Sequence, residues 1–145
     1  MKDNKNGFTL IELIVCIGII AALGIVVGLN SNDVVDKATI SKNESVYEEL
    51  FDAASVYAEL SSNRTICSSR CNVTIQRLID AGLLEKTILE TKNPIYSGDI
   101  HFMNNNRLYI QFNSGVKIVE FRCPSDSEKN ITSENINDYE WGKCN

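Results

Sequence analysis

The sequence predicts an α+β fold, in which a long N-terminal helix packs on a small antiparallel β-sheet headgroup. Two patterns predict it. An almost unbroken apolar run over residues 8–29 passes into a helical pattern that continues to about residue 62, and strand-like runs follow in the second half. A chain of 145 residues has room for one globular domain and an appendage. We therefore expect a short polar segment at 1–7, an apolar helix at 8–29 and a globular part at 30–145.

The apolar run is long enough to cross a bilayer. Residues 8–29 are apolar apart from Thr9 and Glu12. As a helix they would measure about 33 Å, against a hydrocarbon core of about 30 Å. Lys2 and Lys5 precede the run, and positive residues on that flank favour a cytoplasmic N-terminus. The pattern predicts a single membrane span with the C-terminus outside.

Glu12 is the one acidic residue inside this run. An ionised carboxylate in hydrocarbon costs several kcal/mol unless it is paired, so an acid at this position suggests a function. However, Thr9-Leu10-Ile11-Glu12 also fits the capping box that opens many helices. That interpretation places Glu12 near the membrane interface and requires no function.

A motif around the start of the run resembles a known processing signal. Gly7 is followed by Phe8-Thr9-Leu10-Ile11-Glu12-Leu13-Ile14, which resembles the class III signal of type IV pilins and pseudopilins. The resemblance implies that residues 1–7 are a leader, that prepilin peptidase cleaves between Gly7 and Phe8, and that Phe8 is then N-methylated. It also implies that Glu12 meets the Phe8 amine of a neighbouring subunit, because both charges must be neutralised in an apolar filament core. The apolar half lacks the proline that many pilins have.

The resemblance implies a structural subunit, major or minor, of a type IV pilus. Its implied partners are prepilin peptidase, other pilin subunits, the pilus assembly platform and the cytoplasmic membrane. The resemblance implies that the precursor is located in the cytoplasmic membrane and that the assembled subunit is located in a pilus at the cell surface. A type II secretion pseudopilin or a competence pilin carries the same signal and remains an alternative. A single-span membrane protein with an extracellular binding domain is a further alternative. The signal does not separate adhesion, twitching motility, protein secretion and DNA uptake.

A helical pattern continues beyond the apolar run, over residues 32–62, with Asn43-Glu44-Ser45 as a possible break. A polar loop is expected at 63–72, followed by a short helix over Thr74–Leu84 that Gly82 ends. The apolar positions of the long helix recur at three- and four-residue spacing and predict its core face. They are Val46, Tyr47, Leu50, Phe51, Ala54, Tyr57 and Ala58.

Three strand-like runs follow, at Asp99–Met103, Arg107–Phe112 and Val116–Phe121. Asn104-Asn105-Asn106 and Asn113-Ser114-Gly115 separate them, and both have good turn compositions. The runs predict an antiparallel meander that the long helix covers.

Four of the five cysteines lie beyond the apolar run, whereas Cys16 lies within it. An even number outside the membrane suits two disulfides, with three possible connectivities. Free thiols and a four-cysteine zinc site are the alternatives. The resemblance favours the pairing of Cys123 with Cys144, because many pilins close a C-terminal loop with a disulfide. Cys67 and Cys71 would then pair locally.

The composition argues against nucleic-acid binding. Residues 30–145 contain 12 Lys plus Arg and 17 Asp plus Glu, so this part has no general attraction for phosphate backbones. Arg64, Arg70 and Arg77 could form a local basic patch, but they are dispersed. We expect no direct nucleic-acid binding.

Little in the sequence suggests catalysis or metal binding. His101 is the only histidine, and no nucleophile motif or glycine-rich phosphate loop is present. Asp126, Glu128 and Asn130 alternate as in a calcium loop, but Ile131 stands where that loop requires glycine. We predict a solvated acidic loop, no metal, no cofactor and no enzymatic activity.

Overall fold

The structure is a computed structural model that describes residues 10–60 and 67–145, and within residues 18–34 it describes the backbone alone. The chain divides into two compact units, Met1–Thr39 and Ile40–Asn145. We call the second unit the head. The predicted leader at residues 1–7 lies outside the described residues.

The longest element is α1, which runs from Leu10 to Glu59 and contributes to both units. It passes through Asn43-Glu44-Ser45 without interruption, so the possible break there is not present. Within this stretch Ser45 Oγ donates to the carbonyl of Ser41 at 2.9 Å, a contact that a helix accommodates. The helix contains no proline, which is the residue that most often interrupts one.

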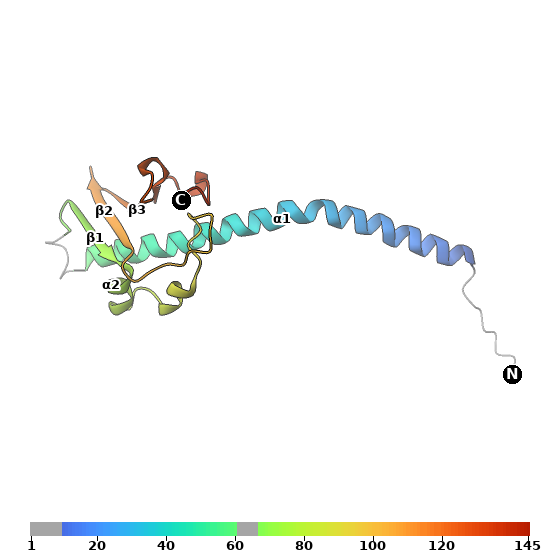
Figure 1. Ribbon diagram of the computed structural model, residues 1–145, viewed down its shortest axis with the longest axis horizontal. Coiled ribbons are helices and arrows are strands. Elements are labelled where there is room, and N and C mark those ends of the chain that lie inside the picture. Colours follow the sequence, from blue (N-terminus) through green and yellow to red (C-terminus); the bar gives the residue numbers. More distant parts are fainter. Residues whose placement is uncertain (1–9, 61–66) are drawn as a thin grey trace, which may run out of the picture. The chain divides into compact units, whose positions relative to one another are not determined.

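The second half of α1 supplies one wall of the head's core. The predicted apolar stripe is confirmed, with Tyr47, Leu50, Phe51, Ala54 and Ala58 buried and Val46 and Tyr57 packed partly buried against them. The strands supply the facing wall. Its buried side chains are Val73, Leu108, Ile110, Val119 and Phe121. The fold is therefore α+β, with one helix covering one face of a small sheet (Figure 1).

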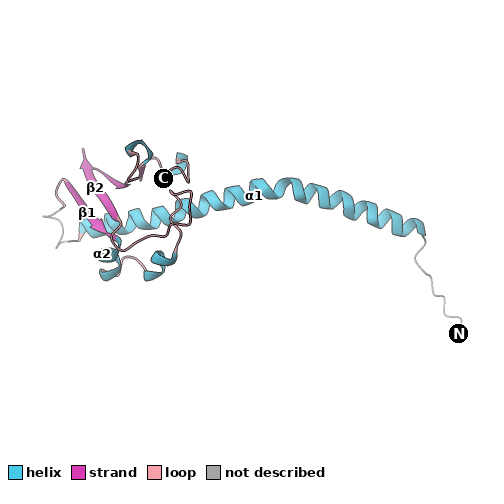
Figure 2. Ribbon diagram, viewed as in Figure 1, coloured by secondary structure: helices cyan, strands magenta, loops and turns pink. Residues whose placement is uncertain are grey.

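The sheet has four antiparallel strands in the order β1-β2-β3-β4. Figure 2 labels the first two of them, β1 and β2. Their bounds are β1 Arg70–Thr74, β2 Arg107–Asn113, β3 Val116–Phe121 and β4 Ile131–Thr132. The two runs predicted for β2 and β3 are confirmed. Ser114 and Gly115 join them with φ values of 50° and 85°, the left-handed pair that a two-residue hairpin turn requires.

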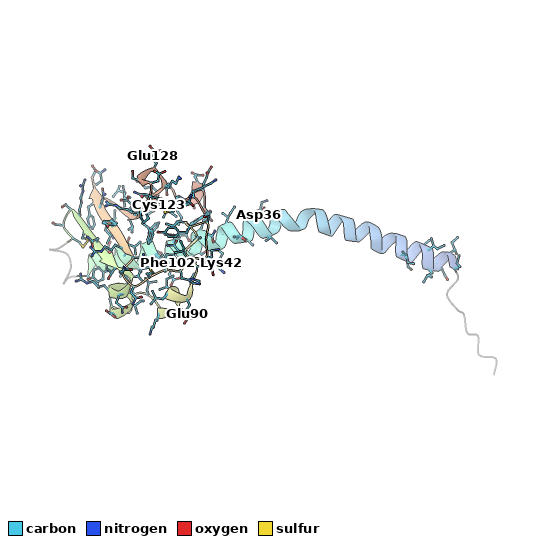
Figure 3. The ribbon with its side chains drawn as sticks, in the orientation of Figure 1. Asp36, Lys42, Glu90, Phe102, Cys123 and Glu128 are labelled. Carbon is cyan, nitrogen blue, oxygen red and sulfur yellow. A yellow bond between two sulfur atoms is a disulfide. The ribbon has the colours of Figure 1, made fainter. Side chains whose placement is uncertain are left out.

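The strand predicted at Asp99–Met103 is wrong. This segment makes a single bridge, between His101 and Lys92, flanked by hydrogen bonds from Asn93 N to Ile100 O at 2.7 Å and from Phe102 N to Thr91 O at 3.2 Å. The pairing cannot extend, because a 3-10 helix ends at Glu90 on one side and Pro94, which lacks an N–H, follows on the other. Phe102 nevertheless reaches the core (Figure 3).

The first strand of the sheet comes instead from β1, which begins inside the predicted loop at 63–72. Residues 61–66 of that loop lie outside the described residues. The inward side chains of β1 are Cys71, which is half-buried, and Val73, which is buried, so the apolar signal in this segment is short. Pairing with β2 over five residue pairs makes this segment a strand.

The short predicted helix is confirmed as α2, Ile75–Asp80, and it is shorter than expected. Thr74 caps its N-terminus through a hydrogen bond from Arg77 N to Thr74 Oγ1. Gly82 has a φ of 72°, and Gly82 N and Leu83 N donate to the carbonyls of Ile79 and Leu78. This is the Schellman pattern, which terminates the helix before Leu84. The remaining helices are the 3-10 turns Lys86–Glu90, Ser127–Lys129 and Ile136–Asp138.

Candidate functional site

The first two turns of α1 expose an apolar surface. Six large apolar side chains between Leu10 and Ile17 are 54–77% exposed. They are Leu10, Ile11, Leu13, Ile14, Val15 and Ile17. A contiguous apolar surface of this kind marks a region that contacts a membrane or another protein.

Glu12 lies in the first turn of α1, and its side chain is exposed among these apolar residues. A carboxylate near a helix N-terminus is favourable, because the amide dipoles leave partial positive charge there. The predicted cleavage and methylation residues, Gly7 and Phe8, lie outside the described residues, as does Thr9, the first residue of the predicted capping box.

The predicted membrane span at 8–29 falls largely on residues whose side chains lie outside those described. Across the described parts of the chain, no helix combines the length and the apolar character needed to cross a bilayer.

Two disulfides lie in the head. Cys67 pairs with Cys71, with Cα atoms 5.0 Å apart, and Cys123 pairs with Cys144, with Cα atoms 5.6 Å apart. These are the two pairs that the resemblance favours. Cys16 is the free cysteine of the described residues, and it is exposed on α1.

The Cys123–Cys144 disulfide holds the C-terminal segment against the rest of the head. Cys144 is fully buried, and its N–H donates to Ile95 O at 2.8 Å. Gly142 N donates to Pro94 O at 2.9 Å, so two backbone hydrogen bonds and one disulfide hold the last residues of the chain. The Trp141 ring lies 5.7 Å from the Tyr47 ring, and it thereby joins this segment to the core.

A buried polar contact beside this segment could not be found from the sequence. Tyr47, which is fully buried, donates its hydroxyl hydrogen to Asn93 Oδ1 at 2.7 Å, and Ile95 N donates to the same oxygen at 3.3 Å. Burial raises the pKa of Tyr47 well above its usual value, so the phenol stays neutral. The contact supports the fold, because it satisfies a polar group of α1 inside the core.

The residues that resemble a calcium loop are used in local hydrogen bonds. Asp126 Oδ1 accepts from Glu128 N at 3.0 Å, and Asn130 Oδ1 accepts from Cys123 N at 2.9 Å. The Asn130 amide also donates to Glu120. These contacts order the turn that precedes β4. Among the described residues, no three metal-binding side chains gather at one place.

The remaining polar candidates lie on different elements or outside the described residues. His101 is exposed at its single bridge, Arg77 is exposed on α2, and Arg64 lies outside the described residues. Arg70 on β1 instead shares a sheet face with Arg107 and Arg122. Sequence reasoning missed these two, because only the strand register places them on the same face as Arg70.

Comparison with known proteins identifies the N-terminal segment. Residues 2–28 match the family model of the prokaryotic N-terminal methylation motif. No curated protein and no solved structure matches the chain. The matched segment contains Gly7, Phe8 and Glu12, together with the exposed apolar start of α1. The chain therefore carries the class III prepilin signal of type IV pilin-like proteins.

Proposed function

We propose that this protein is a structural subunit, major or minor, of a type IV pilus. The observation that carries the proposal is the match at residues 2–28 to the N-terminal methylation motif. We assign cleavage to Gly7 and Phe8 and the assembly role to Glu12, which all lie within the matched range. The exposed apolar residues at the start of α1 support it, since a filament built from helices needs such a surface on each subunit.

The mechanism begins with a precursor held in the cytoplasmic membrane, its head outside. Prepilin peptidase cleaves between Gly7 and Phe8, and Phe8 is then N-methylated. The assembly platform moves the subunit from the membrane into the filament, where the apolar part of α1 exchanges lipid for neighbouring helices. Apolar contacts replace apolar contacts in this step, so the transfer has no large hydrophobic cost.

Glu12 gives the transfer its specificity in this proposal. The new ammonium of Phe8 and the Glu12 carboxylate each cost several kcal/mol if they are buried alone, and they compensate each other when they pair between subunits. A subunit that docks out of register would leave both charges unpaired. The pair therefore selects the docking register of each added subunit.

The head is the part of the subunit that meets the outside. Its two disulfides suit an oxidising space beyond the cytoplasmic membrane. We assign it no enzymatic role. A type II secretion pseudopilin or a competence pilin would use the same signal and the same first steps.

The test of processing is the N-terminal sequence and intact mass of the protein purified from its native membrane or from sheared filaments. A chain that begins at N-methylated Phe8 supports the proposal. A chain that still begins at Met1, in cells with active prepilin peptidase, would instead favour a single-span membrane protein with a binding domain.

The test of assembly is the substitution Glu12→Gln, which keeps the size of the side chain and removes its charge. We expect normal cleavage and loss of the subunit from filaments, measured by immunoblotting of the sheared fraction. Glu48→Gln, at an exposed acid of the same helix, is the control and should assemble normally. Normal incorporation of Glu12→Gln would refute the pairing role.

A further inference from the structure

Three arginines surround one tyrosine on the face of the sheet that lies opposite α1. Along each strand the buried side chains point to α1, and the alternate side chains point away from it. The outward positions include Arg70 on β1 and Arg107 and Tyr109 on β2. Arg122 follows β3 directly. We call Arg70, Arg107, Arg122 and Tyr109 the arginine–tyrosine surface.

The strand register brings these residues together. Leu108 pairs with Phe121, so Arg107 and Arg122 occupy the next opposing positions. Arg70 pairs with Gln111, diagonally across from Tyr109. Like charges at opposing positions repel each other, so the pairing of Arg107 with Arg122 depends on contacts that each arginine makes with other side chains.

Two of the guanidinium groups are held in place. The Arg122 guanidinium carbon lies 3.7 Å from the centre of the Tyr109 ring, and its Nε lies 3.4 Å from Glu120 Oε1. Arg107 Nη1 donates to Asn72 Oδ1 at 3.2 Å. Groups that are already oriented lose less entropy when they bind a ligand.

Two clefts adjoin this surface, and Tyr109 and Arg122 line both of them. The smaller has a volume of about 150 Å³, and its polar lining includes Arg70, Asn72 and Gln111. The larger has a volume of about 440 Å³, and its lining includes Tyr96, Asn105, Asn106 and Arg107. Neither lining contains an aspartate or a glutamate, and the carboxylate beside them is Glu120, the partner of Arg122.

We propose that the arginine–tyrosine surface binds an acidic polysaccharide, a chain of sugars that carry carboxylates. The planar guanidinium fork matches a carboxylate, and the side-chain amides of the clefts can both donate to and accept from sugar hydroxyls. Arg107 and Arg70 are separated by about four residues along the strands, or about 14 Å. That spacing suits an extended ligand with several carboxylates better than a small anion.

Nucleic acid fits this surface less well. Duplex DNA carries one charge per about 1.7 Å, and three arginines on a chain of net charge -5 neutralise few of them. Single strands bind where aromatic rings are open for stacking, but the Tyr109 ring is already covered by Arg122. Sugar carboxylates need neither a dense positive charge nor a free ring.

The test uses the full chain in detergent and surfaces that carry immobilised polygalacturonate, neutral dextran, or single- or double-stranded DNA. The variant is Arg107→Gln with Arg122→Gln. Arg77→Gln, on α2 and outside both clefts, controls for loss of positive charge. We expect salt-sensitive binding to polygalacturonate and not to dextran, weakened about tenfold or more in the double variant and less than about twofold in Arg77→Gln.

Several results would overturn the proposal. These are equal binding by the wild type and the double variant, an equal loss in Arg77→Gln, absence of binding to polygalacturonate, or stronger binding to DNA. Arg122→Lys keeps the charge and removes the planar fork, so this variant should bind polygalacturonate more weakly than the wild type. Equal binding by the two proteins would show that charge attraction alone causes binding, which contradicts recognition of carboxylates by the guanidinium group. Thermal unfolding of each variant excludes loss of the fold. The measurement needs no filament, so its outcome is independent of the proposed pilus role.

Discussion

Removing the Cys123–Cys144 disulfide should destabilise the head more than removing Cys67–Cys71. In the chain-entropy model a disulfide restricts the unfolded chain in proportion to the logarithm of the loop it closes. The sequence separations are 21 and 4 residues, which correspond to about 3 and about 2 kcal/mol at 25 °C. The variants are Cys123→Ala with Cys144→Ala, and Cys67→Ala with Cys71→Ala.

The structure adds to this difference. Cys144 is fully buried and its backbone pairs with Ile95, so the longer loop also holds the segment that carries Trp141. With an unfolding entropy of about 2.1 cal/mol/K per residue over the head, about 3 kcal/mol corresponds to a fall in Tm of about 13 °C. The shorter loop corresponds to a fall of about 9 °C.

The assay is urea and thermal unfolding of the detergent-solubilised full chain, followed by tryptophan fluorescence. Trp141 is the only tryptophan and packs against Tyr47, so the signal reports the C-terminal segment directly. Alkylation without reductant comes first, and Cys16 should be the only thiol that reacts. If the Cys67 and Cys71 variant loses as much stability as the other, loop length and C-terminal packing do not determine the effect.

Two further predictions concern the hairpin and the core. Gly115→Ala should lower the free energy of unfolding by about 1 kcal/mol, because the φ of 85° strains any residue with a Cβ. The control is Gly98→Ala, where an added Cβ meets nothing closer than 3.9 Å, and it should leave the urea midpoint unchanged. Equal effects of the two substitutions would contradict the turn assignment. Burial raises the pKa of Tyr47 above the value of 10.0 that the unfolded chain has, and the pKa of Tyr139 rises for the same reason. The folded chain therefore holds these protons more tightly, so this contribution to the unfolding free energy is complete below about pH 10 and lost as the pH rises above it. Tyr47→Phe should lower the free energy of unfolding by about 1 kcal/mol at neutral pH, because the side-chain oxygen of Asn93 loses one donor. The variant should also lose less stability than the wild type at alkaline pH. An unchanged dependence of stability on pH would show that Tyr47 does not titrate on unfolding.

The sequence predicted the elements whose signals are local. The core face of α1, the β2–β3 hairpin and α2 each follow from periodicity or from a turn within a few residues. The strand at Asp99–Met103 was wrong because its alternation is real but its possible partner is interrupted by Pro94. β1 was missed for the opposite reason, since a segment with only two inward side chains becomes a strand when β2 pairs with it.

The same distinction separates the N-terminal motif from the arginine–tyrosine surface. The motif is contiguous in the sequence, and the family model matches it over residues 2–28. The arginine–tyrosine surface joins residues from β1, β2 and the end of β3, whose mutual register depends on distant pairing. Alternation along β2 could show that Arg107 and Tyr109 share a face, but it could not place Arg70 or Arg122 beside them.

The buried core of the described residues lies entirely within the head. It begins at Tyr47 and ends at Cys144. The exposed apolar residues at the start of α1 belong to the other unit. If the proposed transfer of those residues from lipid to neighbouring helices occurs, we expect no repacking within the head. We expect hydrogen exchange of β2 and β3 amides to be the same in the membrane-held and filament forms, and faster exchange in one of them would show that the two units are coupled.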